Sequence, residues 1–164
     1  MEIKYDSLFQ KIGAHFTNSK NEVIPAEDIF KIPVLALFFT GSWCPPCEEF
    51  SAELVNFYNE ANQKEKHFEI IQITNEKSEL IYKNSIEKLP WTFIPFGDLI
   101  IKDIVEHYKV NYLPFFVIIN KEGYVASDTG RKEISDPNFT HKQKIDKWKL
   151  VIRSSVEKPI ETIN

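Results

Sequence analysis

The sequence predicts an α/β fold, in which a central mixed β-sheet is flanked by helices. Two observations predict it: continuous apolar runs of strand length, which require burial on both faces, and amphipathic segments between them with apolar residues at helical spacing. The 164 residues contain no Pro/Gly/Ser-rich linker and no internal repeat. This length fits one domain on the usual scale of about 150 residues per domain. We therefore expect a single domain over residues 1–164, with its core over about 11–157.

Four segments are predicted to be strands. The first and third are continuous apolar runs, as in buried strands, and the fourth follows a polar turn at residues 120–123. That turn, Asn-Lys-Glu-Gly, makes the third and fourth strands an antiparallel pair at one edge of the sheet. The predicted strands are residues 34–39, 68–74, 115–119 and 124–127.

Four helices are predicted between and after these strands. The first starts at a pair of cysteines, and Phe50, Leu54 and Phe57 begin an i, i+4, i+7 pattern that continues to Ala61. Pro90 ends the second helix. An apolar connection containing a proline, residues 91–96, precedes the third helix. The remaining helices are expected over residues 78–88, 98–110 and about 141–157.

The first thirty residues predict an N-terminal hairpin extension of the sheet. Its two arms would be residues 12–16 and 23–24, joined by the polar segment 17–21.

Composition excludes several classes of protein. Two cysteines are too few for a disulfide scaffold or for a four-ligand zinc site. A net charge of −4 is unlike that of nucleic-acid-binding domains. The longest apolar run, residues 33–39, is too short for a membrane helix, and the charged first ten residues lack a signal-peptide core. We expect no cofactor, metal, nucleic-acid or membrane partner, and a cytoplasmic or nuclear location.

Cys44 and Cys47 carry the chemistry that the sequence suggests. They follow a buried strand and begin a helix, and their i, i+3 spacing brings the side chains within about 5–6 Å, close enough for a disulfide. A helix N-terminus favours a thiolate, which is the attacking species in disulfide exchange. We expect Cys44, at the junction, to be the exposed nucleophile, and Cys47, one turn further, to be the buried resolving thiol. A metal site or an accidental pair is the alternative.

Pro45 and Pro46 stand between the cysteines and cannot donate backbone hydrogen bonds to the Cys44 thiolate. The nearest remaining donor is the N–H group of Cys47. We therefore expect the pKa of Cys44 to be lowered only moderately. The prolines should also stiffen the segment and favour closure of the disulfide.

The motif Trp43-Cys44-Pro45-Pro46-Cys47 resembles the thioredoxin superfamily, and its Pro-Pro form is similar to tryparedoxins and nucleoredoxins. The resemblance extends over about residues 11–137. Further matches occur in the same order along the chain, namely residues 88–91, 94–98, 108–110 and 113–114.

The resemblance implies a supporting site around the cysteines. Pro114 matches a cis proline that faces them, and Leu113 provides the backbone before it, which can pair with an extended substrate. Trp43 matches a tryptophan that shields the nucleophile. Arg131 matches an arginine of this branch, although it could equally be a surface residue. Trp91 could border a substrate groove or pack beneath the sheet.

Three departures from the family pattern stand out. Phe38 occupies the place of a buried aspartate that transfers protons in thioredoxins. Glu48 follows the second cysteine, where many relatives have arginine, and should raise the thiol pKa. Residues 74–76, Thr-Asn-Glu, replace the Trp-Asp-Glu of tryparedoxins, which puts trypanothione in doubt as the reductant.

The expected function is that of a thiol–disulfide oxidoreductase acting on protein disulfides. An external thiol or reductase would restore the dithiol, and peroxiredoxins are downstream partners that the resemblance implies. The alternative is a redox-sensitive binding module of the nucleoredoxin type. A third reading, a peroxidase, lacks the additional thiol that it would need.

Overall fold

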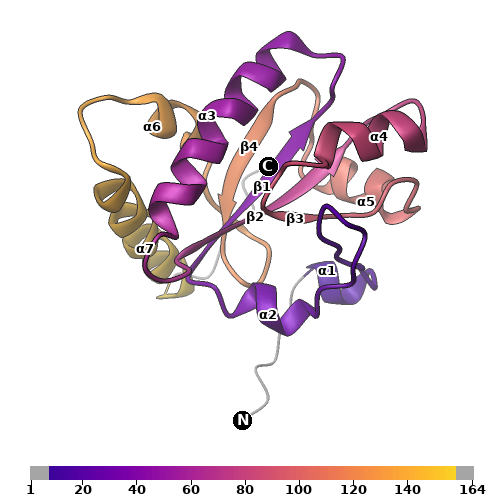
Figure 1. Ribbon diagram of the computed structural model, residues 1–164. Helices are drawn as coiled ribbons and strands as arrows, with labels where there is room; N and C mark the ends of the chain where they lie inside the picture. Colours follow the sequence, from indigo (N-terminus) through magenta and orange to yellow (C-terminus); the bar gives the residue numbers. More distant parts are fainter. Residues whose placement is uncertain (1–7, 158–164) are drawn as a thin grey trace.

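Residues 8–157, which the computed structural model describes, fold around a five-stranded sheet (Figure 1). The strands are arranged in the order β3-β2-β1-β4-β5. Strands β1, β2 and β3 are parallel to one another, whereas β4 is antiparallel to both β1 and β5. The strand bounds are β1 Val34–Thr40, β2 Phe68–Thr74, β3 Thr92–Phe93, β4 Phe115–Ile119 and β5 Val125–Ser127.

The two central strands explain where a site can form. β1 and β2 pair in register from Val34 with Phe68 to Thr40 with Thr74, and all fourteen residues are buried. The apolar run of β1 predicts this burial, whereas β2 also buries three polar residues, namely Glu69, Gln72 and Thr74. Because the strands are parallel and in register, their carboxyl ends meet at one edge of the sheet. Ligands of parallel α/β sheets bind at this edge.

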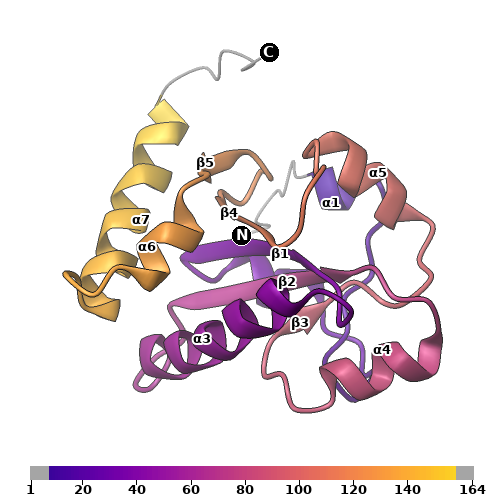
Figure 2. The same ribbon diagram turned by 90° about the horizontal axis from the view of Figure 1, so that it is seen from above.

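In the described part of the chain, seven helices cover the two faces of the sheet. They are α1 Leu8–Lys11, α2 Ala26–Phe30, α3 Pro45–Ala61, α4 Glu79–Ile86, α5 Ile100–His107, α6 Gly130–Ser135 and α7 His141–Glu157. Side chains of α3, α4, α6 and α7 pack on one face of the sheet, and those of α1, α2 and α5 pack on the other. Figure 2 shows α3 and α5 on opposite sides of the sheet. Successive side chains of β1 point to opposite faces of the sheet, so Phe38 packs in the layer of α3 and Phe39 packs in the layer of α5.

Two parts of the architecture differ from the expectation for the sheet. Residues 91–96 are not merely a connection, because Thr92–Phe93 forms the short strand β3 beside β2. The antiparallel part is also larger than an edge pair, since β4 runs antiparallel to β1 in the middle of the sheet. The four predicted helices appear as α3, α4, α5 and α7, and α6 was not predicted.

The N-terminal region forms two short helices, α1 and α2, where the sequence predicted only a hairpin. The hairpin is reduced to a bridge between Thr17 and Val23, with a backbone hydrogen bond from Ile24 to Phe16. Thr17 also bridges Phe93, so this segment covers the open edge of β3. Phe9 and Phe30 contribute to the core instead of extending the sheet.

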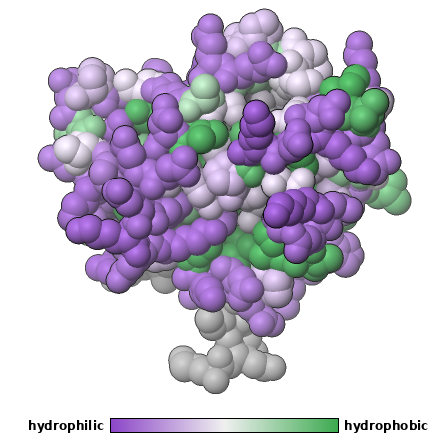
Figure 3. Space-filling model, viewed as in Figure 1, coloured by the Kyte–Doolittle hydropathy of each residue, from purple (hydrophilic) through white to green (hydrophobic). Residues whose placement is uncertain are grey.

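The surface seen in Figure 3 is mostly hydrophilic, with small apolar areas between the polar side chains. Within residues 8–157, no helix is long and apolar enough to cross a membrane. The same residues contain no cluster of three or more His, Cys, Asp or Glu side chains suited to a metal ion.

Candidate redox site

The cysteine pair lies where β1 passes into α3. Cys44 has extended backbone angles and occupies the N-cap position, and Pro45 is the first residue of the helix. Proline fits there because the first helical N–H groups have no intrahelical partner. Cys44 and Cys47 are joined by a disulfide, with their Cα atoms 5.2 Å apart. The structure therefore holds the oxidised form of the pair that the sequence singled out.

The two cysteines differ in their access to solvent. Cys44 is 8% exposed, whereas Cys47 is fully buried at 0%. The backbone N–H groups of Cys47 and Glu48 both donate to the carbonyl oxygen of Cys44, at 3.0 and 3.2 Å. The N–H group of Cys47, which the sequence left as the nearest donor to the Cys44 sulfur, thus donates to a backbone carbonyl oxygen instead. The first turn of α3 provides fewer donors to a thiolate than an ordinary helix start would.

Trp43 precedes the pair and is 56% exposed. Its indole Nε1 donates to the carbonyl oxygen of Asn75 at 2.8 Å, and the N–H of Asn75 donates to the carbonyl oxygen of Thr40 at 3.0 Å. These bonds tie the turn before Cys44 to the loop that follows β2.

Glu76 fixes the same turn from the loop after β2. One carboxylate oxygen accepts from the Ser42 N–H at 2.6 Å, and the other accepts from the Ser42 hydroxyl at 2.8 Å. In the sequence, residues 74–76 stand out only as a departure from tryparedoxins, and the contact of Glu76 with Ser42 was not predicted. The contact joins residues 34 positions apart, so no local pattern could reveal it.

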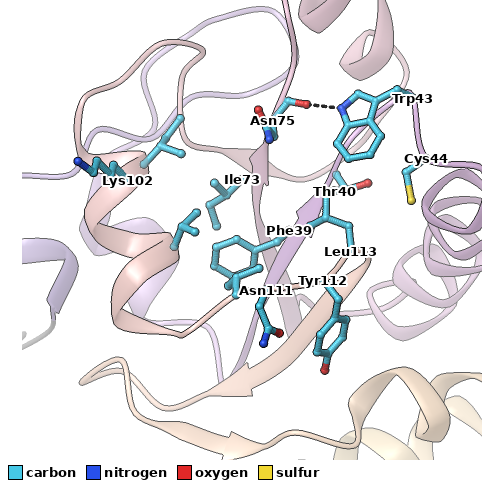
Figure 4. A pocket seen from close by; sticks show the side chains of 13 residues that line it. Phe39, Thr40, Trp43, Cys44, Ile73, Asn75, Lys102, Asn111, Tyr112 and Leu113 are labelled. Atoms are coloured by element: carbon cyan, nitrogen blue, oxygen red, sulfur yellow. Dashed lines mark hydrogen bonds between the residues drawn. The ribbon is translucent and has the colours of Figure 1, made fainter.

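A cavity of about 540 Å³ opens beside Cys44, and we call it the apolar cavity (Figure 4). The Cys44 sulfur, the Trp43 ring and Leu113 stand at one end of it, and α5 forms the far wall. The peptide bond between Leu113 and Pro114 is cis, as the resemblance implies. Most of the remaining wall is aliphatic or aromatic, and it includes Phe39, Ile73, Ile101, Val105 and Val110.

A second cavity of about 540 Å³ lies on the other side of the disulfide, between α3, α4 and the end of β2. We call it the polar cavity. Cys47 lines it, and Cys44 does not. Thr40, at the end of β1, borders both cavities. The wall of the polar cavity carries hydroxyl, amide and carboxylate groups, set among apolar side chains such as Val55 and Leu89; these polar groups come from Ser42, Glu48, Ser51, Gln72, Thr74 and Glu76.

Trp91 is packed beneath the sheet and does not border a groove. It is 1% exposed, and its Nε1 donates to the Gln72 side chain at 2.8 Å. Arg131 is exposed, and its guanidinium lies 5.6 Å from the centre of the Phe50 ring, outside both cavities. Phe38 packs its ring against Phe50, Trp91 and Phe116, so the core side of α3 is aromatic where thioredoxins carry an acid.

Pro45 and Pro46 are exposed between the two cysteines, as are Glu48 and Glu49 on the first turns of α3. None of the four histidines lines the two cavities beside the disulfide. His67 and His141 lie elsewhere, in a charged cavity near the end of α3 and the start of α7.

Comparison with known proteins indicates one family, the thioredoxin-like proteins. A model of a thioredoxin-like family matches residues 33–125. Probable nucleoredoxin 1 of Arabidopsis thaliana is 32% identical over 97 residues, which cover 58% of this chain and 17% of that protein. Probable nucleoredoxin 3 of Oryza sativa is 26% identical over 137 residues, covering 79% and 28%. The chain thus spans between 17% and 28% of the length of these relatives.

Solved structures show the same fold. Thioredoxin from Wuchereria bancrofti superposes with a TM-score of 0.68 and 27% identity, covering 82% of this chain and 93% of that one. Tryparedoxin I from Leishmania major gives a TM-score of 0.69 and 25% identity, covering 77% and 88%.

Proposed function

The chain belongs to the thioredoxin-like family, in its tryparedoxin and nucleoredoxin branch, and on this premise we propose that it reduces disulfide bonds in other proteins. Cys44 is the nucleophile and Cys47 the resolving thiol. The observation that carries this proposal is the unequal exposure of a disulfide-bonded pair at a helix start, with Cys44 at the edge of a cavity and Cys47 buried.

The reaction begins from the reduced dithiol. The Cys44 thiolate attacks one sulfur of a substrate disulfide, forms a mixed disulfide and expels the first substrate thiolate. Cys47 then attacks the Cys44 sulfur, which closes the disulfide seen in the structure and expels the second substrate thiolate. Two electrons pass from the dithiol to the substrate, and both substrate thiolates take up protons. An external thiol or a reductase must restore the dithiol for the next cycle.

The apolar cavity supports a protein substrate. Trp43 and the exposed Tyr112 border it together with Cys44, so an extended segment could place apolar side chains there while its disulfide meets the sulfur. The supporting roles of Pro45, Pro46, Leu113 and Pro114 belong to this proposal. Peroxiredoxin-type peroxidases as recipients, and a cytoplasmic or nuclear location, are proposed on the resemblance alone.

The test is reduction of insulin by dithiothreitol with the protein as catalyst. We expect the wild type to accelerate the reaction, Cys44→Ser to remove the acceleration, and Cys47→Ser to accumulate a mixed disulfide. A Cys44→Ser variant that matches the wild type would refute the assignment. The thermal unfolding of each variant serves as a control for folding.

A second candidate function is a redox-dependent binding module. The exposed carboxylates of Glu48 and Glu49 stand beside the disulfide, where they could meet a basic partner. Binding would then differ between the oxidised and reduced forms. Equal affinity for both forms and for a double Cys→Ser variant would exclude it.

A further inference from the structure

The buried sulfur of Cys47 raises a problem that the sulfur of Cys44, at the edge of the apolar cavity, does not. Its attack on the mixed disulfide requires a thiolate, yet burial among apolar groups raises the pKa of a thiol. The core on which α3 packs is rich in aromatic side chains, including Phe38 and Phe50. A proton leaving Cys47 therefore needs a route on another side.

The polar cavity provides such a route, because Cys47 lines it although the residue is 0% exposed. A cavity of this size with polar walls holds water. Its titratable side chains, among the described residues that line it, are Cys47, Glu48 from α3 and Glu76 from the loop after β2. The wall from α4 adds only uncharged groups such as Asn84 and Ser85.

Hydrogen bonds order the wall of this cavity. Trp91 donates to Gln72 at 2.8 Å, and the Gln72 amide donates to the Thr74 hydroxyl at 2.8 Å. The Thr74 hydroxyl accepts the hydrogen bond from Gln72, so its own proton is left for another partner. Thr74 lines the polar cavity, and that proton can be donated to water within it.

Glu76 is held more firmly than Glu48 on the wall of this cavity. Both of its oxygens are held by Ser42, at 2.6 and 2.8 Å, whereas Glu48 is exposed on the helix surface. Each carboxylate oxygen has a second lone pair, so Glu76 can accept from cavity water while it remains bound to Ser42.

We propose that the polar cavity is the proton-exchange route of Cys47 and that Glu76 is the acceptor. The proposal rests on the reductase function proposed above. The Cys47 thiol gives its proton through water to the Glu76 carboxylate, and the resulting thiolate attacks the Cys44 sulfur of the mixed disulfide. The Cys44–Cys47 bond forms, the bond to the substrate breaks, and the substrate thiolate leaves with the electron pair. Glu76 then returns the proton to the departing thiolate or to solvent.

The test is a single-turnover reduction of insulin by the reduced protein, quenched with acid and analysed by mass spectrometry for the mixed disulfide. The variant is Glu76→Gln, which keeps one acceptor for Ser42 but cannot take a proton. We expect its resolution step to be slowed about tenfold or more at about pH 7, within the range of general-base effects. The deficit should shrink towards about pH 9, where hydroxide removes the proton directly. Alkylation of Cys44 by iodoacetamide should be no slower than in the wild type.

Two controls separate proton transfer from loop support. Glu48→Gln removes the other carboxylate of the cavity and should resolve the mixed disulfide within about twofold of the wild type. Ser42→Ala loosens the turn but keeps the carboxylate, so any deficit should be the same at every pH.

The proposal is overturned if the Glu76→Gln profile follows the wild type, if its deficit is independent of pH as in Ser42→Ala, or if Glu48→Gln shows the pH-dependent loss instead. Failure of the reductase function is a separate result, because the wild type would then form no mixed disulfide at any pH.

Discussion

The two cavities beside the disulfide have similar volumes and differ in the polar side chains that line them. The one beside Cys44 is lined mainly by aliphatic and aromatic side chains, with Lys102 as its charged group. The one beside Cys47 combines apolar side chains with hydroxyl, amide and carboxylate groups, including those of Glu48 and Glu76. Thr40 separates them at the end of β1. The difference assigns them different tasks: an apolar wall favours a substrate side chain, whereas a polar wall favours water and protons.

The largest effect should come from the aromatic core beneath α3. Phe38 is fully buried against three aromatic rings, so Phe38→Ala should lower the free energy of unfolding by about 3–5 kcal/mol. Ser51→Ala, on the wall of the polar cavity, should change it by about 0.5 kcal/mol or less. Urea denaturation measures both. Equal losses would mean that the two sides of the helix are not packed differently.

A charge in the apolar cavity should impair substrate binding next. Val105 lies in its wall, and Val105→Glu should reduce kcat/KM for insulin by about tenfold or more, mainly through KM. The matched control is Ser85→Glu in the polar cavity, for which we expect a change of at most about twofold in KM. If the two variants raise KM equally, the apolar cavity has no special role in binding.

The smallest effect concerns the acidity of Cys44. The first turn of α3 gives its sulfur few donors, and the carboxylates of Glu48 and Glu49 stand nearby. The Cys44 pKa should therefore lie in the upper part of the range for such motifs, about 3.5–7.5. Replacing both glutamates by glutamine should lower it by less than about one unit, because exposed charges are screened. Thiolate absorbance against pH measures this, and a wild-type pKa below about 5 contradicts the account.

What the sequence could predict followed from local patterns. The buried strand over 34–39 and the amphipathic α3 depend on apolar periodicity, and the cysteine pair at their junction depends on spacing. β3 was missed because two residues carry no periodicity, and its pairing depends on β2 and Thr17. The contact of Glu76 with Ser42 joins segments that are distant in the sequence. Trp91 lies beneath the sheet and not at a groove, and its indole donates to Gln72, a residue 19 positions away. Contacts between distant segments form only when the chain packs, so local sequence patterns do not reveal them.

The central claim is that the two sulfurs are unequal, with Cys44 at the edge of the apolar cavity and Cys47 on the wall of the polar cavity. Limited alkylation of the reduced protein with one equivalent of iodoacetamide, followed by peptide mass spectrometry, tests it most directly. The account predicts that the label falls almost entirely on Cys44. Equal labelling of the two residues, or preferential labelling of Cys47, would contradict it.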